Sequence, residues 1–438
     1  MAAEQESPAR DLVAIARRAA SAEPALRERA ALEVVDAVAC MRLGSSHALV
    51  TRVAAAGSWL DPGPHAAFAA TGVGLEEAVR LDALSCHVDE LDSIEPVSAT
   101  VPAAIVVPAA LHAARHVGAT GAVLVDAVLA GYDVLTFLGR SLGGAEAYRH
   151  GWWPSSTLGA VGAAAAVASV LGLDDERYAA ALGLAAARTG GLISDDALGA
   201  GHYLAAADAT VAGLRAGLLA GAGLDASSTY VSGPGSRALA SWRTVEPPAP
   251  GDGVRATMTK PFPCARPLQG VAAALLAGRV PLDGLDSVVV ELPAPLLQFV
   301  SADVEVPDAT GAAASAAHVL AAVRAGRAGD AHFFRTASLA GLAPVPPVEL
   351  RPWVDAPAGS WGCRVHLRTS GGDVHVLTGE PPVVAPDAIA AKARRTLVDA
   401  GVSGPVAAEV VQDLSDLSSH PTVRNLRLHE RLSAPVDG

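Results

Sequence analysis

Alanine-rich apolar segments restrict what this chain can fold into more than any other feature of its sequence. The longest of them, residues 158–173 (LGAVGAAAAVASVLGL), is short for a membrane span and rich in glycine and alanine. Because alanine is the best helix former, we interpret this segment as a buried core helix. Across the chain, 51% of the residues are apolar but only 4% are aromatic, which predicts a largely helical and tightly packed protein.

The first 265 residues have the pattern of a succession of helices. Apolar faces repeat at helical spacing, and glycines stand where several of the patterns end. The segment 89–102 interrupts them as a turn-like stretch with prolines. The expected helices cover residues 11–20, 25–44, 74–88, 107–118, 122–143, 157–173, 175–192 and 203–222.

Residues 266–385 have a different pattern, which is typical of a small α+β module. A strand is expected at 287–293, and a helix at 315–326. Apolar and polar residues alternate in 363–369 and 373–378, on either side of two glycines, and this pattern predicts a β-hairpin.

The last part of the chain returns to helix, with residues 386–397 helical and Asp387 as the expected cap. Since 438 residues are too many for one typical core, two domains are expected. The expected fold class is mainly α. A large all-helical domain covers residues 1–265, helices of 386–438 pack back onto it, and a smaller α+β domain covers residues 266–385.

Charge and cysteine usage argue against several classes of function. The net charge is −13 and no run of Lys or Arg is present, so no nucleic-acid partner is expected. The N-terminal MAAEQES is acidic and polar, unlike a signal peptide, and no membrane association is expected. No P-loop or dinucleotide fingerprint appears, so no cofactor is expected. The cysteines form no CxxC pair, which favours reduced thiols, a cytoplasmic location and no metal site; they are Cys40, Cys86, Cys264 and Cys363.

The segment TKPFPCARPLQ (259–269) holds Lys260, one of only two lysines in the chain. Unlike the arginines that supply nearly all other positive charge, a lysine can lose its proton when it is buried. Lys260 is therefore either a chemical site or an ordinary lysine with its ammonium at the surface. Cys264 is not expected to act as a nucleophile, because no histidine lies near it in the sequence.

Several longer motifs stand in a fixed order along nearly the whole chain. They are HVDELDS (87–93), VVPAAL with AVLAGYDV (106–134), STLGAVGAAAAVASVLGLD with ALGLAA (156–186) and KPFPCARPLQGVAAAL (260–275). This order resembles the MmgE/PrpD family, which includes 2-methylcitrate dehydratase and cis-aconitate decarboxylase. The resemblance implies a helical domain with a smaller α+β lid, usually in a homodimer, and a small acid as the substrate.

The resemblance also implies an acid–base site on this chain. His87 and Asp92 match the family's acidic block, in which Glu90 here replaces an aspartate, and Lys260 matches an active-site lysine. A lysine at that position can donate a proton to a leaving group or hold a substrate carboxylate.

Other family positions are changed. Val101 and Trp153 stand where family members usually carry histidines, and Gln269 replaces a further one. His202 lies near the position of a usual lysine and His318 near that of a tyrosine. Removing one member of a cooperating set costs orders of magnitude in rate, so an unchanged 2-methylcitrate dehydratase is not expected. The exchanges also make the pocket more apolar and less cationic, which disfavours a tricarboxylate.

We assign candidate roles on this basis. Lys260 is expected to act as acid or carboxylate anchor, His202 as base and Asp92 as the group that orients the site, with His87 and His318 as further catalytic candidates. Each histidine can equally be structural, and the carboxylates can cap backbone groups. Ser155 and Ser156 can also cap the helix that follows them, and the N-terminus of that helix can hold a carboxylate. Candidates for substrate binding are Glu90, Thr100, Trp153, Ser155, Ser156, Arg266 and Gln269.

Three functions stay open for such a chain. The first is a divergent, cofactor-independent lyase or isomerase of specialised metabolism, which moves a proton during dehydration, decarboxylation or isomerisation of a small carboxylic or carbonyl compound. The second is a catalytically inactive relative that binds a ligand or partners an active subunit. The third is a purely structural dimer. The retained Lys260, His87 and Asp92 favour the first.

Overall fold

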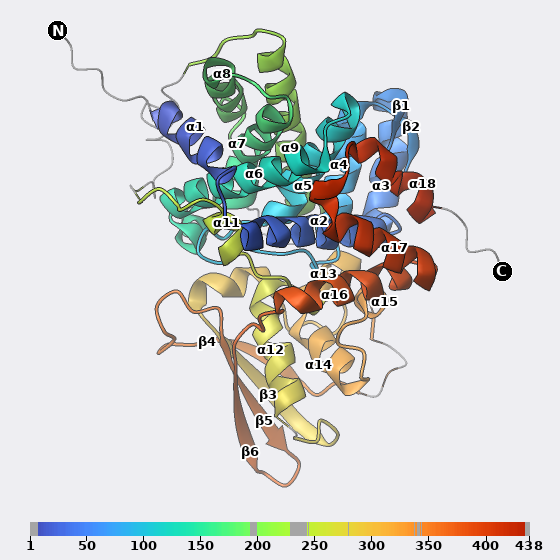
Figure 1. The fold of residues 1–438 in the computed structure, drawn as a ribbon. Helices are drawn as coiled ribbons and strands as arrows, with labels where there is room; N and C mark the ends of the chain where they lie inside the picture. Colours follow the sequence, from blue (N-terminus) through green and yellow to red (C-terminus); the bar gives the residue numbers. More distant parts are fainter. Residues whose placement is uncertain are drawn as a thin grey trace.

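The chain forms a helical bundle and a smaller lid that contains a β-sheet, as seen in a computed structural model (Figure 1). The structure describes residues 8–192, 199–227, 243, 245–278, 280–336, 338, 339, 342 and 344–433. The expected fold class, mainly α with a smaller α+β part, is confirmed.

The bundle is built from helices that begin where the sequence offers a start signal. Proline occupies the first turn of α2, α5 and α7, where its missing N–H costs no hydrogen bond. The described helices before the lid are α1 (Pro8–Ala19), α2 (Pro24–Gly44), α3 (Ala48–Leu60), α4 (Leu75–His87), α5 (Pro102–Val117), α6 (Gly121–Leu142), η1 (Gly144–His150), α7 (Pro154–Val170), α8 (Asp175–Ala186), α9 (Ala200–Gly221) and α11 (Asp252–Ala256).

Helix α7 is the centre of the bundle and packs against α5, α6, α8 and α9. Its residues are almost all buried, as expected for the alanine-rich segment. Small side chains are required here because the backbones approach closely. A Cβ atom on Gly213 of α9 would lie 2.5 Å from the carbonyl oxygen of Ala160 in α7. The bundle core is therefore tightly packed without many large side chains.

The lid is a four-stranded mixed sheet with helices on one side (Figure 1). The strand order is β4-β3-β5-β6, with β3 parallel to β4 and antiparallel to β5. Helices α12 and α14 pack together and contribute to the same apolar core as β3 and β5. The lid elements are α12 (Arg266–Ala277), β3 (Leu285–Leu292), η2 (Ala294–Phe299), α13 (Ala309–Ala313), α14 (Ala316–Arg324), α15 (Ala331–Phe334), β4 (Val348–Pro352), β5 (Cys363–Thr369) and β6 (Val374–Gly379).

After the lid the chain returns to the bundle. Helices α16 and α17 pack against α2, and η3 packs against α6. Figure 1 shows α16 running along the junction between the bundle and the lid. These last described elements are α16 (Pro386–Asp399), α17 (Gly404–Ser415), η3 (Leu417–Ser419), η4 (Val423–Leu426) and α18 (Leu428–Ser433).

Several local details differ from the sequence-based expectations, among them helix α3, which was not expected. A small hairpin, β1 (Pro62–Ala66) and β2 (Thr71–Val73), interrupts the region expected to be all helical, and β4 was not expected. Helix α16 begins at Pro386 with Ala385 as its N-cap, so Asp387 is not the cap. Helix α7 begins at Pro154 with Trp153 as its N-cap and without a side-chain cap. Both helices instead begin with proline, whose missing N–H is one of the groups that a helix start leaves unsatisfied.

Among the described residues, two helices are long and apolar enough to cross a membrane by length and composition alone. In α6 and α9, 78% and 56% of the most apolar window is buried inside the fold. Most of each window therefore packs inside the fold.

Candidate active site

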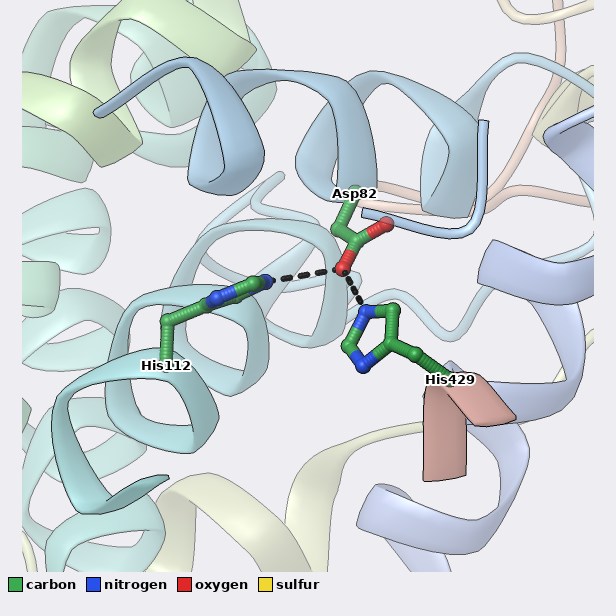
Figure 2. Close-up of side chains that lie close together, drawn as sticks. All are labelled: Asp82, His112 and His429. Atoms are coloured by element: carbon green, nitrogen blue, oxygen red, sulfur yellow. Dashed lines mark hydrogen bonds and ion pairs between the residues drawn. The ribbon is translucent and has the colours of Figure 1, made fainter. Parts of the chain in front are cut away.

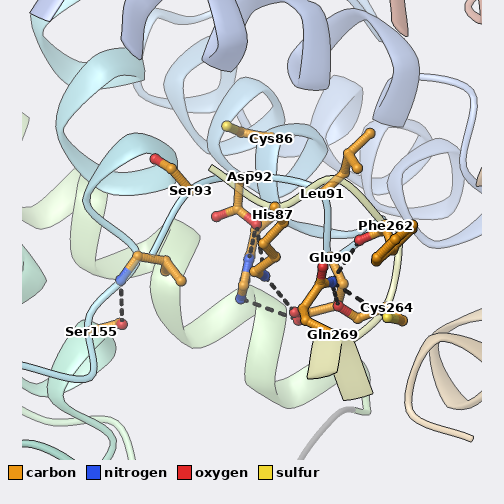
Figure 3. A network of polar contacts seen from close by, with 12 residues as sticks. Cys86, His87, Glu90, Leu91, Asp92, Ser93, Ser155, Phe262, Cys264 and Gln269 are labelled. Atoms are coloured by element: carbon orange, nitrogen blue, oxygen red, sulfur yellow. Dashed lines mark hydrogen bonds and ion pairs between the residues drawn. The ribbon is translucent and has the colours of Figure 1, made fainter. Parts of the chain in front are cut away.

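The segment between α4 and α5 turns sharply directly after His87. Glu90 has a φ angle of 53°, in the left-handed region, where a residue other than glycine is disfavoured by roughly 1–2 kcal/mol. The turn brings the carboxylates of Glu90 and Asp92 back towards His87 (Figure 3). The surrounding contacts must hold this strained turn in place.

Lys260 is buried and pairs with both carboxylates of this turn. Its Nζ atom lies 2.8 Å from Oε2 of Glu90 and 3.4 Å from Oδ1 of Asp92, and its side chain is only 1% exposed. Burial opposes the charge of Lys260, but Glu90 and Asp92 outweigh burial and raise the pKa of Lys260 above its ordinary value. The same ammonium and His87 lower the pKa values of Glu90 and Asp92 despite their burial. Lys260 is therefore a buried charged group and not a surface lysine.

His87 is oriented by Asp92. Its Nδ1 lies 3.0 Å from Oδ1 of Asp92, so Nδ1 carries a proton and Nε2 faces away from Asp92 (Figure 3). Burial lowers the pKa of His87, but the carboxylates of Asp92 and Glu90 outweigh burial and raise it overall. His87 can therefore hold a proton at a pH where a free histidine has lost it.

His202 lies in the first turn of α9 and faces His87. The two Nε2 atoms are 3.4 Å apart, and the ring of His202 stacks on Trp153 with 3.8 Å between ring centroids. Burial, together with the charge of His87, lowers the pKa of His202 to about 3. Trp153 therefore fixes the ring of His202 by stacking, while burial and His87 keep that ring neutral.

These groups converge on a pocket between the bundle and the lid. The bundle contributes His87, Glu90, Ile94, Val101, Trp153 and His202, and Lys260 reaches the pocket from the segment before α12. The lid contributes Arg266, Pro267, Phe299 and Trp361. The cavity measures about 40 Å³, enough for on the order of three waters. A substrate with several carbon atoms is larger than this cavity.

Arg266, the first residue of α12, brings a further positive charge to the pocket. Its side chain is buried, and among the described residues Nε and Nη1 have no hydrogen-bond partner. Nη2 contacts only Sδ of Met258, at 3.1 Å. Burial lowers the pKa of Arg266 to about 10, so the guanidinium remains charged at neutral pH. A buried guanidinium with free N–H groups is suited to bind a carboxylate.

Several other predicted residues are buried behind the residues that line the pocket and are not part of its lining. Oγ1 of Thr100 lies 2.7 Å from Oγ of Ser98. Oγ of Ser155 accepts a hydrogen bond from the backbone N–H of Val101. Ser156 donates to the carbonyl oxygens of Trp153 and Gly191. These contacts fix the walls that carry Val101 and Trp153.

The side chains of two predicted residues of the lid region are also hydrogen-bonded to backbone carbonyl oxygens. Gln269 donates to the carbonyl oxygens of Phe262 and Cys264 (Figure 3). His318 in α14 is fully buried, and its Nε2 lies 3.2 Å from the carbonyl oxygen of Thr336. His318 is not among the residues that line the pocket. Cys264 is buried, and burial raises the pKa of its thiol.

The aromatic walls of the pocket were not anticipated. Tyr148 and Phe299 pack edge to face with 4.6 Å between ring centroids, and Trp361 completes this side. Tyr203 also approaches the site, with its hydroxyl 3.3 Å from Oε1 of Glu90. None of these residues belongs to a recognisable motif; only the position of Tyr203 beside His202 was a signal.

Two clusters of described residues offer atoms that could hold a metal ion. The first consists of His87, Glu90 and His202, whose potential ligand atoms lie within 4.8 Å of one another. Glu90 and Asp92 are already paired with the Lys260 ammonium, so this cluster has its own cation.

The second cluster consists of Asp82, His112 and His429, all buried (Figure 2). The histidine Nε2 atoms lie 2.8 and 3.0 Å from Oδ2 of Asp82. Arg115 donates to Nδ1 of His429, so Nε2 of His429 must carry a proton. A protonated nitrogen cannot bind a metal, and the cluster therefore fits a set of hydrogen bonds that fastens α18 to α4 and α5.

Comparison with known families gives one match. The model of the MmgE/PrpD N-terminal domain matches residues 12–238, which is more than half of the chain. The matched region includes His87, Glu90, Asp92, Trp153 and His202. No curated protein matches the chain.

Proposed function

Because the chain belongs to the MmgE/PrpD family, we propose that it is a divergent lyase that transfers a proton to a small carboxylic or carbonyl compound. The family is one of dehydratases and related lyases. The observation that carries the proposal is the convergence of Lys260, His87 and His202 on one pocket that also contains an unpaired Arg266.

The charge state of the site favours proton donation over proton abstraction. At neutral pH Lys260 carries a proton, and the raised pKa of His87 favours one there too. Glu90 and Asp92 are tied to these cations and have lowered pKa values, which makes them weak bases. The base role expected for His202 stays a prediction, but a pKa of about 3 favours a role in passing on the proton of His87.

A site rich in donors suits decarboxylation better than dehydration. Dehydration requires a base for the proton next to the carboxylate, whereas decarboxylation releases CO₂ first and then requires an acid. The carbon–carboxylate bond breaks, and its electron pair delocalises onto a neighbouring carbonyl oxygen. Lys260 stabilises that oxygen, and His87 delivers a proton to the carbon through His202. Solvent then restores the proton on His87.

The walls of the pocket favour a substrate with few charges. Arg266 binds a carboxylate that stays on the product. Val101, Trp153 and Phe299 offer an apolar surface to the rest of the molecule, including the group lost as CO₂. Departure of a carboxylate as a neutral molecule is favoured on an apolar surface. A small oxo acid with two carboxylates meets these requirements better than a tricarboxylate does.

The test is incubation of the protein with a panel of small oxo acids and unsaturated acids in deuterated water, followed by NMR. We expect CO₂ release, or deuterium at a carbon next to a carbonyl, that is lost in Lys260→Met and His87→Asn. His318→Asn, outside the pocket, is the matched control and should stay active. A wild-type protein that binds such acids without any exchange or CO₂ release would instead be an inactive ligand-binding relative. The presence of Val101 and Trp153 where family members usually carry histidines is compatible with that alternative.

A further inference from the structure

The only two lysines of the chain are both buried, and both reach the turn between α4 and α5. Lys392 lies in α16. Its Nζ atom is 2.8 Å from Oδ1 of Asp36 and donates to the backbone carbonyl oxygen of Leu91 over 2.7 Å. Leu91 stands between the two acidic residues that pair with Lys260. Between them, the two ammonium groups hold three consecutive residues of the turn: Lys260 pairs with Glu90 and Asp92, and Lys392 binds Leu91.

The positions of the lysines in the chain add to this relationship. Lys260 precedes α12, where the lid begins, and Lys392 belongs to the first helix after β6, where the lid ends. The turn is also held by Glu33, which accepts a hydrogen bond from Ser93 over 2.5 Å. Both connections between lid and bundle are thus fastened to the turn that carries the acidic residues of the site.

Stability alone does not account for Lys392. Taking an ion pair out of water costs much of what the pair gains, and replacing both partners by apolar residues is often neutral or stabilising. The bond from Lys392 to the carbonyl oxygen of Leu91 is different, because it fixes a strained backbone in which Glu90 has a φ angle of 53°. A backbone held in this way orients the side chains on either side of it.

We propose that Lys392 is a positioning residue that holds the carbonyl group of Leu91 and so keeps Glu90 and Asp92 directed at Lys260. It does not line the pocket and reaches the site through the backbone of the turn and through its charge near Asp92. This inference rests on the proposed function only where a reaction rate is measured. Its main consequence, the state of Lys260, can be measured without a substrate.

The experiment uses the full chain labelled with ¹³C at the ε-carbon of lysine, which gives two NMR signals because there are two lysines. The variant Lys392→Met/Asp36→Leu removes the buried pair as a whole and leaves Lys260 as the single, unambiguous signal. We expect the pKa of Lys260 to fall by at least about one unit, because Glu90 and Asp92 no longer face it closely. With a substrate in hand, kcat should fall by about tenfold or more while KM stays nearly unchanged.

The control for a general loss of stability is Leu397→Ala in the same helix, which is buried and makes no bond to the turn. It should leave the pKa of Lys260 unchanged. The variant Lys392→Gln/Asp36→Asn keeps a neutral donor beside Leu91 and should restore most of the lost effect, and it provides the test if the first variant does not fold. If the pKa of Lys260 is the same with and without Lys392, the inference is wrong. Absence of any turnover in the wild type would contradict the proposed function alone.

Discussion

Nζ of Lys260 lies 2.8 Å from Oε2 of Glu90, and both side chains are at least 95% shielded from solvent. A second carboxylate, that of Asp92, lies 3.4 Å from the same ammonium. Two buried negative charges thus share a buried ammonium, which the chain supplies from a segment far away in the sequence. The pair joins the catalytic chemistry proposed above to the stability of the fold.

Replacing Lys260 by methionine should therefore affect both stability and rate. The change leaves Glu90 and Asp92 without the ammonium and with His87 as a cationic partner, and breaking a buried pair on one side costs about 3–5 kcal/mol of the free energy of unfolding. Turnover should be lost as well. Urea denaturation at pH 7 measures the first effect, and the double variant Lys260→Met/Glu90→Gln should recover part of the stability but none of the rate. A Lys260→Met protein as stable and active as the wild type would contradict both roles.

Arg335 of the lid should hold the lid closed. Its guanidinium binds both carboxylate oxygens of Asp89, at 2.6 and 2.8 Å, and also donates to the carbonyl oxygen of Leu43. A movement of the lid that widens the pocket would have to break these bonds. The variant Arg335→Met/Asp89→Asn should open the lid more often and increase hydrogen–deuterium exchange in residues 259–269.

The matched control is Arg324→Met, because Arg324 pairs with Asp283 inside the lid and does not touch the bundle. It should leave exchange in residues 259–269 unchanged. Equal exchange in the Arg335 variant and the wild type would show that other contacts keep the lid closed.

The helical pattern and the hairpin of the lid could be predicted because their apolar residues repeat at regular spacing. The strand β1 could not, since its sequence PGPHA has no alternation and two prolines. It pairs with β2 through a short irregular register that only the folded chain provides. The strand β4 is similarly short and ends at a proline.

In the site, the order of the motifs was enough to predict that Lys260, His87 and Asp92 belong to one site. In the structure, Asp92 contacts both Lys260 and His87. Burial could not be predicted in the same way. Nothing in the local sequence of α16 indicates that Lys392 is buried, and Phe299 and Trp361 reach the pocket only because the lid packs over the bundle. Such contacts depend on tertiary packing, which local patterns do not contain.

Arg266 should bind a substrate carboxylate, and its buried charge should lower the free energy of unfolding of the protein without substrate. Replacing it by methionine removes a charge-assisted hydrogen bond to a carboxylate, which is typically worth about 1.5–3 kcal/mol, so KM should rise by roughly 10- to 100-fold. The free energy of unfolding should stay the same or increase, because an unpaired buried charge disappears. Arg351→Met on the exposed surface of the lid is the control. A large loss of stability in Arg266→Met would instead indicate a structural role.

The neutral state of His202 predicts how stability depends on pH. Its pKa is lowered from 6.5 to about 3 in the folded protein, so the unfolded chain binds a proton first as the pH falls. The stability contributed by this neutral imidazole is complete above pH 6.5 and is lost progressively as the pH falls towards 3. In the variant His202→Phe, which can still stack on Trp153, this loss should disappear. The slope of unfolding free energy against pH between 6 and 4 should become shallower by up to about 1.4 kcal/mol per pH unit, measured by urea denaturation. Identical slopes in variant and wild type would mean that His202 takes up a proton in the folded protein as easily as in the unfolded chain, and the proton relay from His87 would then lose its basis.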